Sequence, residues 1–283
     1  MMMMMLLNLF LLFDASSGLV FRELHRSTLT VRSAKSSDAA MHSTYQKLAD
    51  RALSNLADNK QYWIGIAGGP GSGKSTVAER VVHYLENAGI KSVAIPMDGY
   101  HFSKAILCEL DPPNASTFMP RRGAPFTFDG PAFVRDLRLA KKRQSFSFPT
   151  YSRELSDPIP NGVQLEPHHQ IILVEGNYLF LESIQKLKSL PYSERQEAKR
   201  WIGLLELFDD RWFIIPQGGL EEQRRRLIER HLVTWTDAKT IAWEASTPRE
   251  GATKRTDFND LRNAQLVDYT KDAAHLVVYT TNS

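Results

Sequence analysis

Residues 68–75 read Gly-Gly-Pro-Gly-Ser-Gly-Lys-Ser, which fits the pattern G-x-x-x-x-G-K-[ST]. An apolar run, residues 61–67, comes directly before this stretch, and Val77, Val81 and Leu85 recur after it at every fourth position. The stretch is therefore expected to join a strand to an amphipathic helix. There the glycines let successive backbone N–H groups point at one place, and the helix start adds its positive dipole end. We predict a loop that binds the phosphates of ATP or GTP.

Further along the chain, apolar runs alternate with segments of helical periodicity. Four more runs are expected to be strands: 92–97, 171–174, 212–215 and 276–279. Helices are expected at 42–56, 131–142, 179–190 and 220–232, beside the one that follows the glycine loop. Runs that are apolar on both faces are typical of parallel strands covered by helices. The alternation predicts an α/β fold of the P-loop NTPase type, with a doubly wound, mostly parallel five-stranded sheet and flanking helices.

The composition excludes several classes of protein. The 283 residues are 42% hydrophobic and 24% charged, which fits one large or two small globular domains. Thirty-five basic against 32 acidic residues give a net charge of only +3, and the basic run 141–143 is short, so no nucleic-acid partner is expected. The single cysteine, Cys108, excludes an intrachain disulfide and suits a reducing compartment.

The first forty residues are predicted to lie outside the fold. Residues 1–13 are almost wholly apolar, but a membrane-spanning helix needs about twenty such residues, so no stable membrane span is expected. The stretch 21–37 is rich in Arg and Ser, as a mitochondrial presequence is. Residues 1–40 are interpreted as a poorly ordered extension or targeting segment, or translation begins at Met41. Residues 41–283 form one domain, expected in the cytoplasm or, with a transit segment, in mitochondria.

Two acidic residues directly follow predicted strands. Asp98 follows the run 92–97, and Glu175 follows the run 171–174. Ligands of open α/β sheets bind beyond the carboxyl ends of the strands, where the glycine loop also lies. There Asp98 can accept the proton of a substrate hydroxyl that attacks a phosphate, and Glu175 can hold Mg²⁺. The alternatives are an ordinary turn at Asp98 and a helix-capping role for Glu175.

Five segments, taken in order, resemble the phosphoribulokinase/uridine kinase family, and most closely its pantothenate-kinase-like and fructose-transport-kinase-like branch. They are GGPGSGKST (68–76), MDGYHF (97–102), RRGAPFTFD (121–129), PTYSRELSDP (149–158) and VEGNYL (174–179). A weaker sixth segment is NDLRNA (259–264). The resemblance implies a P-loop kinase of small hydroxyl compounds, with a mobile lid near 233–256.

The motif and the resemblance together assign roles to single residues. Asp98, Lys74 and Arg230 are expected to act in catalysis, with Arg226 as an alternative lid arginine. Ser75 and Glu175 are the expected ligands of Mg²⁺. The residues expected to bind ATP are Gly68, Gly69, Pro70, Gly71, Ser72, Gly73, Lys74, Ser75 and Thr76. The residues expected to contact the acceptor are His101, Arg121, Tyr151 and Arg153. The alternatives are a core position for Tyr151 and a solvated helix face for the lid arginines.

The predicted activity is transfer of the γ-phosphate of ATP, with Mg²⁺, to a hydroxyl of a small molecule. The acceptor is expected to be a nucleoside, a sugar or a pantothenate-like compound, but residues 103–119 bear little likeness to either kinase and leave it open. A guanine-reading [NT]-K-x-D motif is not found, which disfavours a regulatory GTPase. The remaining alternative is a nucleotide-binding regulatory or scaffold protein that does not phosphorylate an acceptor. A homodimer is left open.

Overall fold

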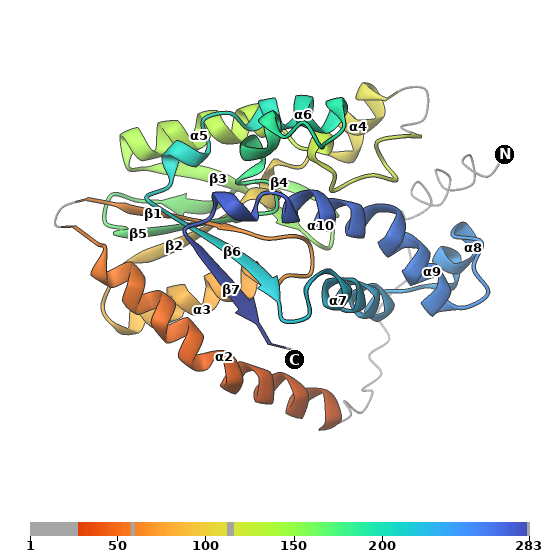
Figure 1. Ribbon diagram of the computed structural model, residues 1–283, viewed down its shortest axis with the longest axis horizontal. Coiled ribbons are helices and arrows are strands. Elements are labelled where there is room, and N and C mark those ends of the chain that lie inside the picture. Colours follow the sequence, from red (N-terminus) through yellow and green to blue (C-terminus); the bar gives the residue numbers. More distant parts are fainter. Residues whose placement is uncertain (1–27, 58–59, 112–115, 282–283) are drawn as a thin grey trace, which may run out of the picture.

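The computed structural model describes residues 28–57, 60–111 and 116–281 (Figure 1). A five-stranded sheet forms its centre, with the strand order β2-β5-β1-β6-β7 and every neighbouring pair parallel. The strands are β1 (Tyr62–Ala67), β2 (Ser92–Pro96), β5 (Ile171–Gly176), β6 (Asp210–Pro216) and β7 (Leu276–Thr280). Each of the five predicted strands is therefore confirmed, and so is the parallel α/β architecture.

Helices cover both faces of this sheet, and two apolar clusters fill the spaces between. The helices α2 (Thr28–Ser54) and α3 (Lys74–Asn87) lie on one face, and α5 (Gly130–Arg143) lies on the other (Figure 1). Neighbouring strand residues alternate between the clusters: Trp63 packs toward α5, whereas Ile64 packs toward α2 and α3. This two-residue period is what a strand buried on both faces requires.

The α2 helix is longer than the sequence predicted. It was expected over 42–56 and spans Thr28–Ser54, so it takes in part of the 1–40 extension. Residues 1–27 of that extension lie outside the described residues. Among the residues that the structure does describe, no helix combines the length and the apolar character needed to cross a bilayer.

Two stretches differ from the prediction. The helix predicted at 179–190 is wrong: residues Leu181–Lys186 form a 3₁₀ helix, and α6 (Tyr192–Ala198) begins only after Pro191. A proline disfavours helical backbone in the residue before it, which separates the two turns. The antiparallel hairpin of β3 (Phe146–Ser152) and β4 (Asp157–Leu165) was not predicted. Its strands contain prolines and a bulge, so the alternation typical of strands is lost.

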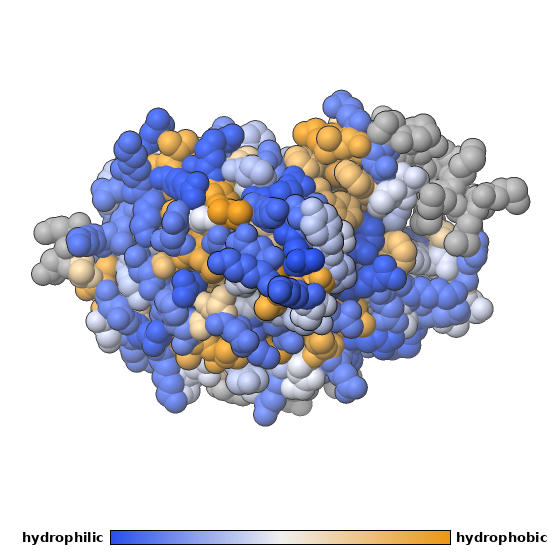
Figure 2. Space-filling view, turned by 45° about the horizontal axis from the view of Figure 1, so that its top comes forward, coloured by the Kyte–Doolittle hydropathy of each residue, from blue (hydrophilic) through white to orange (hydrophobic). Residues whose placement is uncertain are grey.

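The C-terminal helices form an arm beside the carboxyl edge of the sheet (Figure 1). In chain order this arm contains α7 (Gly219–Val233), α8 (Asp237–Ala242), α9 (Pro248–Arg255), a π-helix (Thr256–Asp260) and α10 (Leu261–Asp268). The predicted helix 220–232 is thus confirmed as α7. Hydrophilic residues dominate the face shown in Figure 2, and its hydrophobic areas are small and separate.

Candidate active site

The loop 68–75 joins β1 to α3 in a conformation that needs its glycines. Gly71 and Gly73 have positive φ angles of 81° and 94°, which favour glycine. A Cβ atom at Gly68 would lie 2.5 Å from the carbonyl oxygen of Ile214, and that backbone cannot easily move. The curl of the loop therefore follows from the sequence, whether or not a ligand is bound.

Neighbouring elements hold the loop by hydrogen bonds. The Nε2 of Gln223, on α7, donates to the Pro70 carbonyl at 3.2 Å. The hydroxyl of Thr280, on β7, donates to the Ser72 carbonyl at 2.9 Å. The Oγ of Ser72 is buried and has no hydrogen-bond partner of its own. This unsatisfied hydroxyl and the exposed N–H groups where α3 begins fit the phosphate oxygens of a nucleotide.

Glu175 lies between the loop and the next strand along the sheet. Its Oε2 is 4.0 Å from the Nζ of Lys74, and the Ser75 hydroxyl donates to its Oε1 at 3.1 Å. Burial raises the pKa of Glu175, and the charge of Asp98 raises it further, whereas Lys74 and the Ser75 hydrogen bond oppose the rise. A hydroxyl and a carboxylate side by side are hard oxygen donors, and both therefore fit Mg²⁺.

Asp98 reaches the same edge from β2. In the parallel pairing Pro96 lies opposite Glu175, and Asp98 follows in a 3₁₀ turn, Met97–Tyr100. The side chain of Asp98 is partly exposed, and its charge acts on Glu175. Since Lys74 contacts Glu175 from the start of α3, which follows β1, Lys74 and Asp98 lie on the two flanks of one carboxylate. The structure thus brings the predicted base and the phosphate-loop lysine to one edge of the sheet.

His101 packs directly beside Asp98. Its ring lies 3.9 Å from the Phe128 ring and 4.8 Å from the Tyr151 ring, measured between centroids. Burial lowers the pKa of His101, so its imidazole is neutral near pH 7. The Nδ1 atom lies 2.8 Å from the Asp98 carbonyl oxygen, which can only accept, so Nδ1 carries the proton. The Nε2 atom is then a hydrogen-bond acceptor.

The β3–β4 hairpin contributes Tyr151 to this group. The Arg122 guanidinium lies over the Tyr151 ring at 5.7 Å and pairs with Asp157 at 2.6 Å. Burial raises the pKa of the Tyr151 hydroxyl, and the charges of Asp98 and Asp157 add to the rise. Tyr151 therefore keeps its proton near neutral pH and can donate a hydrogen bond.

The other predicted residues lie farther from Asp98 or point elsewhere. Arg121 donates to the side chains of Asn259 and Asn263, at 3.1 and 3.3 Å. Arg153 is exposed in the turn between β3 and β4. Arg226 pairs with Glu222 at 2.9 Å and donates to Thr280, behind the glycine loop. Arg230 is exposed on α7, and its charge acts on Asp260 of the π-helix.

Sequence reasoning missed several charged residues of this region. Asp157 and Arg122 flank Tyr151, and Arg255 and Asp260 lie where α9 meets the π-helix. Arg122 and Asp157 stand inside the quoted segments 121–129 and 149–158, so they could have been considered. Arg255 stands in no motif and carries no such signal.

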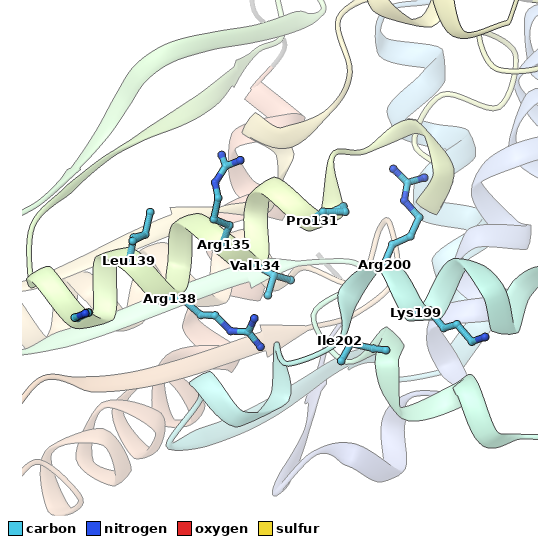
Figure 3. Close-up of a pocket in the computed structure, with 9 residues that line it drawn as sticks. Pro131, Val134, Arg135, Arg138, Leu139, Lys199, Arg200 and Ile202 are labelled. Atoms are coloured by element: carbon cyan, nitrogen blue, oxygen red, sulfur yellow. The ribbon is translucent and has the colours of Figure 1, made fainter.

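A separate hollow lies on the outer side of α5. Its volume is about 520 Å³, and it is lined from α5 and from residues 199–202 (Figure 3). In Figure 3, Arg135 and Arg138 extend from α5 in different directions, and Arg200 extends from the neighbouring segment. None of the predicted site residues lines this hollow. The cluster around Glu175 therefore remains the candidate active site.

Comparison with curated proteins identifies relatives among kinases. The chain is 32% identical over 236 residues to a "putative uridine kinase" of Schizosaccharomyces pombe. This match covers 82% of this chain and 88% of the relative. The chain is 31% identical over 155 residues to an "ATP-dependent kinase-like protein" of Aspergillus versicolor, which covers 52% of this chain and 78% of that protein. The first match covers most of the chain, and the second covers about half of it.

Solved structures agree on the fold. A "putative fructose transport system kinase" from Silicibacter sp. TM1040 superposes with a TM-score of 0.65 at 24% identity, over 83% of this chain and 98% of that one. No protein-family model matches the chain. The extent of the fission-yeast match and the order of the motifs nevertheless settle the assignment. The chain belongs to the phosphoribulokinase/uridine kinase family of P-loop kinases.

Proposed function

We propose that this protein transfers the γ-phosphate of ATP to a hydroxyl group of a small metabolite. One observation carries the proposal: Asp98 and Lys74 flank Glu175 at one edge of the sheet, with Lys74 4.0 Å from it. A base and a phosphate-binding cation in one cleft are what phosphoryl transfer requires. The uridine kinase name of the fission-yeast relative supports this class of reaction.

The proposed transfer step balances as follows. The acceptor oxygen forms a bond to the γ-phosphorus, while the bond from that phosphorus to the bridging oxygen breaks. ADP leaves with the bonding electron pair, and the hydroxyl proton passes to the carboxylate of Asp98. Lys74 holds the β- and γ-phosphates in line, and Arg230 is proposed to neutralise charge on the transferred group.

ATP and Mg²⁺ fit the residues present. Residues 68–76 would hold the phosphates, and Ser75 and Glu175 would hold the metal ion. Bound Mg²⁺ would supply positive charge to the β- and γ-phosphates. Glu175 has a raised pKa, and two positively polarised neighbours, Lys74 and the Ser75 hydroxyl, favour its charged form. Lys74 and Ser75 therefore favour the form of Glu175 that can bind Mg²⁺.

The acceptor half is proposed to include His101 and Tyr151. The Nε2 atom of His101 can accept a hydrogen bond from an acceptor hydroxyl, and the Tyr151 phenol can donate one. Both rings stand against each other, 4.8 Å apart, next to Asp98. Together they can orient a hydroxyl toward the carboxylate that takes its proton. We propose that the predicted lid, residues 233–256, closes over the acceptor half.

The direct test uses the Asp98→Asn variant. Purified protein is given Mg·ATP and a panel of nucleosides, sugars, glycerate and pantothenate, and ADP release is measured. Removing the base should lower acceptor-dependent ADP release by about a hundredfold or more while ATP binding stays intact. Unchanged turnover would remove Asp98 from the mechanism. ATP binding that no acceptor converts into turnover would instead favour a regulatory or scaffold protein.

The proposed location is the cytoplasm, because the one cysteine, Cys108, is exposed and unpaired and suits a reducing compartment. Imaging of the full chain with a C-terminal tag distinguishes this from a mitochondrial location. Light scattering of the purified protein measures whether it is a homodimer.

A further inference from the structure

Two arginines of the C-terminal arm have no counter-charge in direct contact. Among the described residues, Arg230 and Arg255 form neither a hydrogen bond nor an ion pair within 4.0 Å. Four other arginines of the same arm all have a carboxylate partner: Arg224 with Asp257, Arg225 and Arg226 with Glu222, and Arg249 with Glu229. Among the described residues, Arg262 of α10 also has no carboxylate partner, but it lies over the Phe258 ring at 5.5 Å. Arg230 and Arg255 are thus the two arginines of the described arm with no direct contact of this kind.

Arg255 lies four residues before Asn259, whose side chain connects the arm to the acceptor half. It ends α9, and the π-helix that follows is attached to the loop before α5: the Nδ2 of Asn259 donates to the Arg122 carbonyl at 2.8 Å. The Arg122 guanidinium in turn covers the Tyr151 ring. The charge of Arg255 acts on Tyr151, and burial lowers the pKa of Arg255. Arg255 is thus a partly buried cation on the Tyr151 side of the candidate site.

One acidic residue of the π-helix, Asp260, interacts with both of these cations. Burial alone would raise the pKa of Asp260, but the His231 hydrogen bond and the two arginines lower it, so Asp260 is ionised. Its carboxylate contacts the Nε2 of His231 at 2.6 Å, and burial lowers the pKa of that imidazole, which stays neutral. One carboxylate, that of Asp260, thus interacts with two guanidinium groups, and the partly buried Arg255 has no carboxylate in direct contact. A desolvated charge of this kind is costly unless an anion approaches it.

We infer that Arg255 binds an anionic group of the acceptor, so that the acceptor is a hydroxy acid or a phosphorylated polyol rather than an uncharged nucleoside. The inference rests on the proposed kinase function and names the substrate class of the same site. The nucleotide is the other source of anionic oxygens, but its phosphates already have Lys74 and the loop amides. Arg255 instead interacts with Tyr151 and the π-helix.

The test compares acceptors that differ only in charge. With saturating Mg·ATP and the full chain, ADP release is measured with glycerate against glycerol, pantothenate against pantothenol, and uridine as the uncharged nucleoside. We expect the anionic member of the pair that is turned over to have a kcat/KM about tenfold to a hundredfold higher. Arg255→Met should raise KM for that acceptor by a similar factor, leave KM for ATP unchanged, and abolish the preference for charge.

Two further variants keep the result interpretable. Arg255→Lys retains the charge and should recover part of the affinity, which a merely structural role would not predict. Arg249→Met removes an arginine from the same helix, but one that is 64% exposed and paired with Glu229, so its kinetics should match wild type. Retained Mg·ATP binding by Arg255→Met shows that the fold is intact.

Each remaining outcome has a distinct meaning. Efficient turnover of uridine, together with unchanged kinetics of Arg255→Met, would overturn the inference and leave the kinase proposal standing. An equal rise in KM for ATP would assign Arg255 to the nucleotide and would also overturn it. ADP release that no acceptor stimulates would overturn the kinase proposal itself and, with it, the inference.

Discussion

The two halves of the candidate site are built in different ways. The nucleotide half is one continuous stretch, 68–75, whose shape follows from its glycines: a Cβ at Gly68 would clash with the backbone, and Gly71 and Gly73 have positive φ angles. The acceptor half is assembled from the turn after β2, the β3–β4 hairpin and the end of α9. In the proposed function, the backbone of the first half binds the nucleotide, and side chains from distant segments bind the acceptor in the second half. A site built from backbone is visible in sequence, whereas one built from side chains depends on the packing of the whole fold.

The difference predicts where mutations act. A change in the nucleotide half should affect every acceptor alike, because all of them share ATP. A change in the acceptor half should leave ATP binding intact and alter the rate or affinity for one substrate class.

The largest expected effect is that of Lys74→Ala. Loss of the cation that lies 4.0 Å from Glu175 removes charge stabilisation of the phosphates, and kcat/KM should fall by about a hundredfold to a thousandfold for every acceptor. Steady-state ADP release with several acceptors measures the effect. Lys91→Ala, at an exposed lysine before β2, is the control and should match wild type. Losses that differ strongly between acceptors would contradict the division into two halves.

The second prediction concerns the whole sheet rather than either half. Asp210 is 1% exposed and holds α2 to β6 through Arg51, at 2.6 Å, and it also accepts from the Trp212 indole at 2.8 Å. Asp210→Asn should lower the free energy of unfolding by about 2–3 kcal/mol, because it removes a nearly buried charge from its partners. Below the melting transition, both KM values should remain close to wild type.

The pH dependence of that stability difference has a definite sign. Burial alone would raise the pKa of Asp210, but the hydrogen bonds from Arg51 and Trp212 outweigh it, so the pKa lies below the ordinary 3.8. A carboxylate with a lowered folded pKa stabilises the fold above its unfolded pKa and loses this contribution as pH falls through the folded value. Urea unfolding of wild type and Asp210→Asn from pH 7 to pH 3 should show the gap narrowing only below about pH 4. A gap that widens toward low pH would contradict the proposed role of the Arg51 ion pair.

Most of the fold could be predicted from the sequence, and only part of the site. The five strands were visible because each is buried on both faces and reads as an apolar run. The β3–β4 hairpin was missed because Pro149, Pro158 and Pro160 interrupt its alternation. Lys74, Asp98 and Glu175 could be placed together because parallel strands share a carboxyl edge. The place of Arg255 could not be predicted, because it depends on the hydrogen bond from Asn259 to a loop more than a hundred residues earlier in the chain.

The third prediction concerns Gly99, which keeps the acceptor half in shape but has no side chain that binds or reacts. A Cβ atom at Gly99 would overlap the carbonyl of Pro149, where the hairpin packs on the turn that holds Asp98. Gly99→Ala should therefore displace Asp98 from its acceptor and lower kcat by about tenfold or more, with the ATP dissociation constant unchanged. Gly89→Ala is the control, because a Cβ there meets nothing within 4 Å, although its positive φ costs some stability. Weaker ATP binding by Gly99→Ala would show that the two halves are mechanically coupled.

The smallest expected effect separates two residues of the hairpin that the resemblance treats alike. Tyr151 stands between His101 and Arg122, whereas Arg153 is exposed in the turn. Tyr151→Phe keeps the ring contacts and removes one hydrogen-bond donor, so KM for the acceptor should rise about threefold to tenfold. Because burial raises the pKa of this phenol, it stays protonated, and the ratio of mutant to wild-type KM should be constant from pH 6 to about pH 9. Arg153→Ala should change KM by less than about twofold, as exposed side chains without partners do. A larger rise in KM from Arg153→Ala than from Tyr151→Phe would mean that the turn closes onto the acceptor and that the acceptor half extends to Arg153.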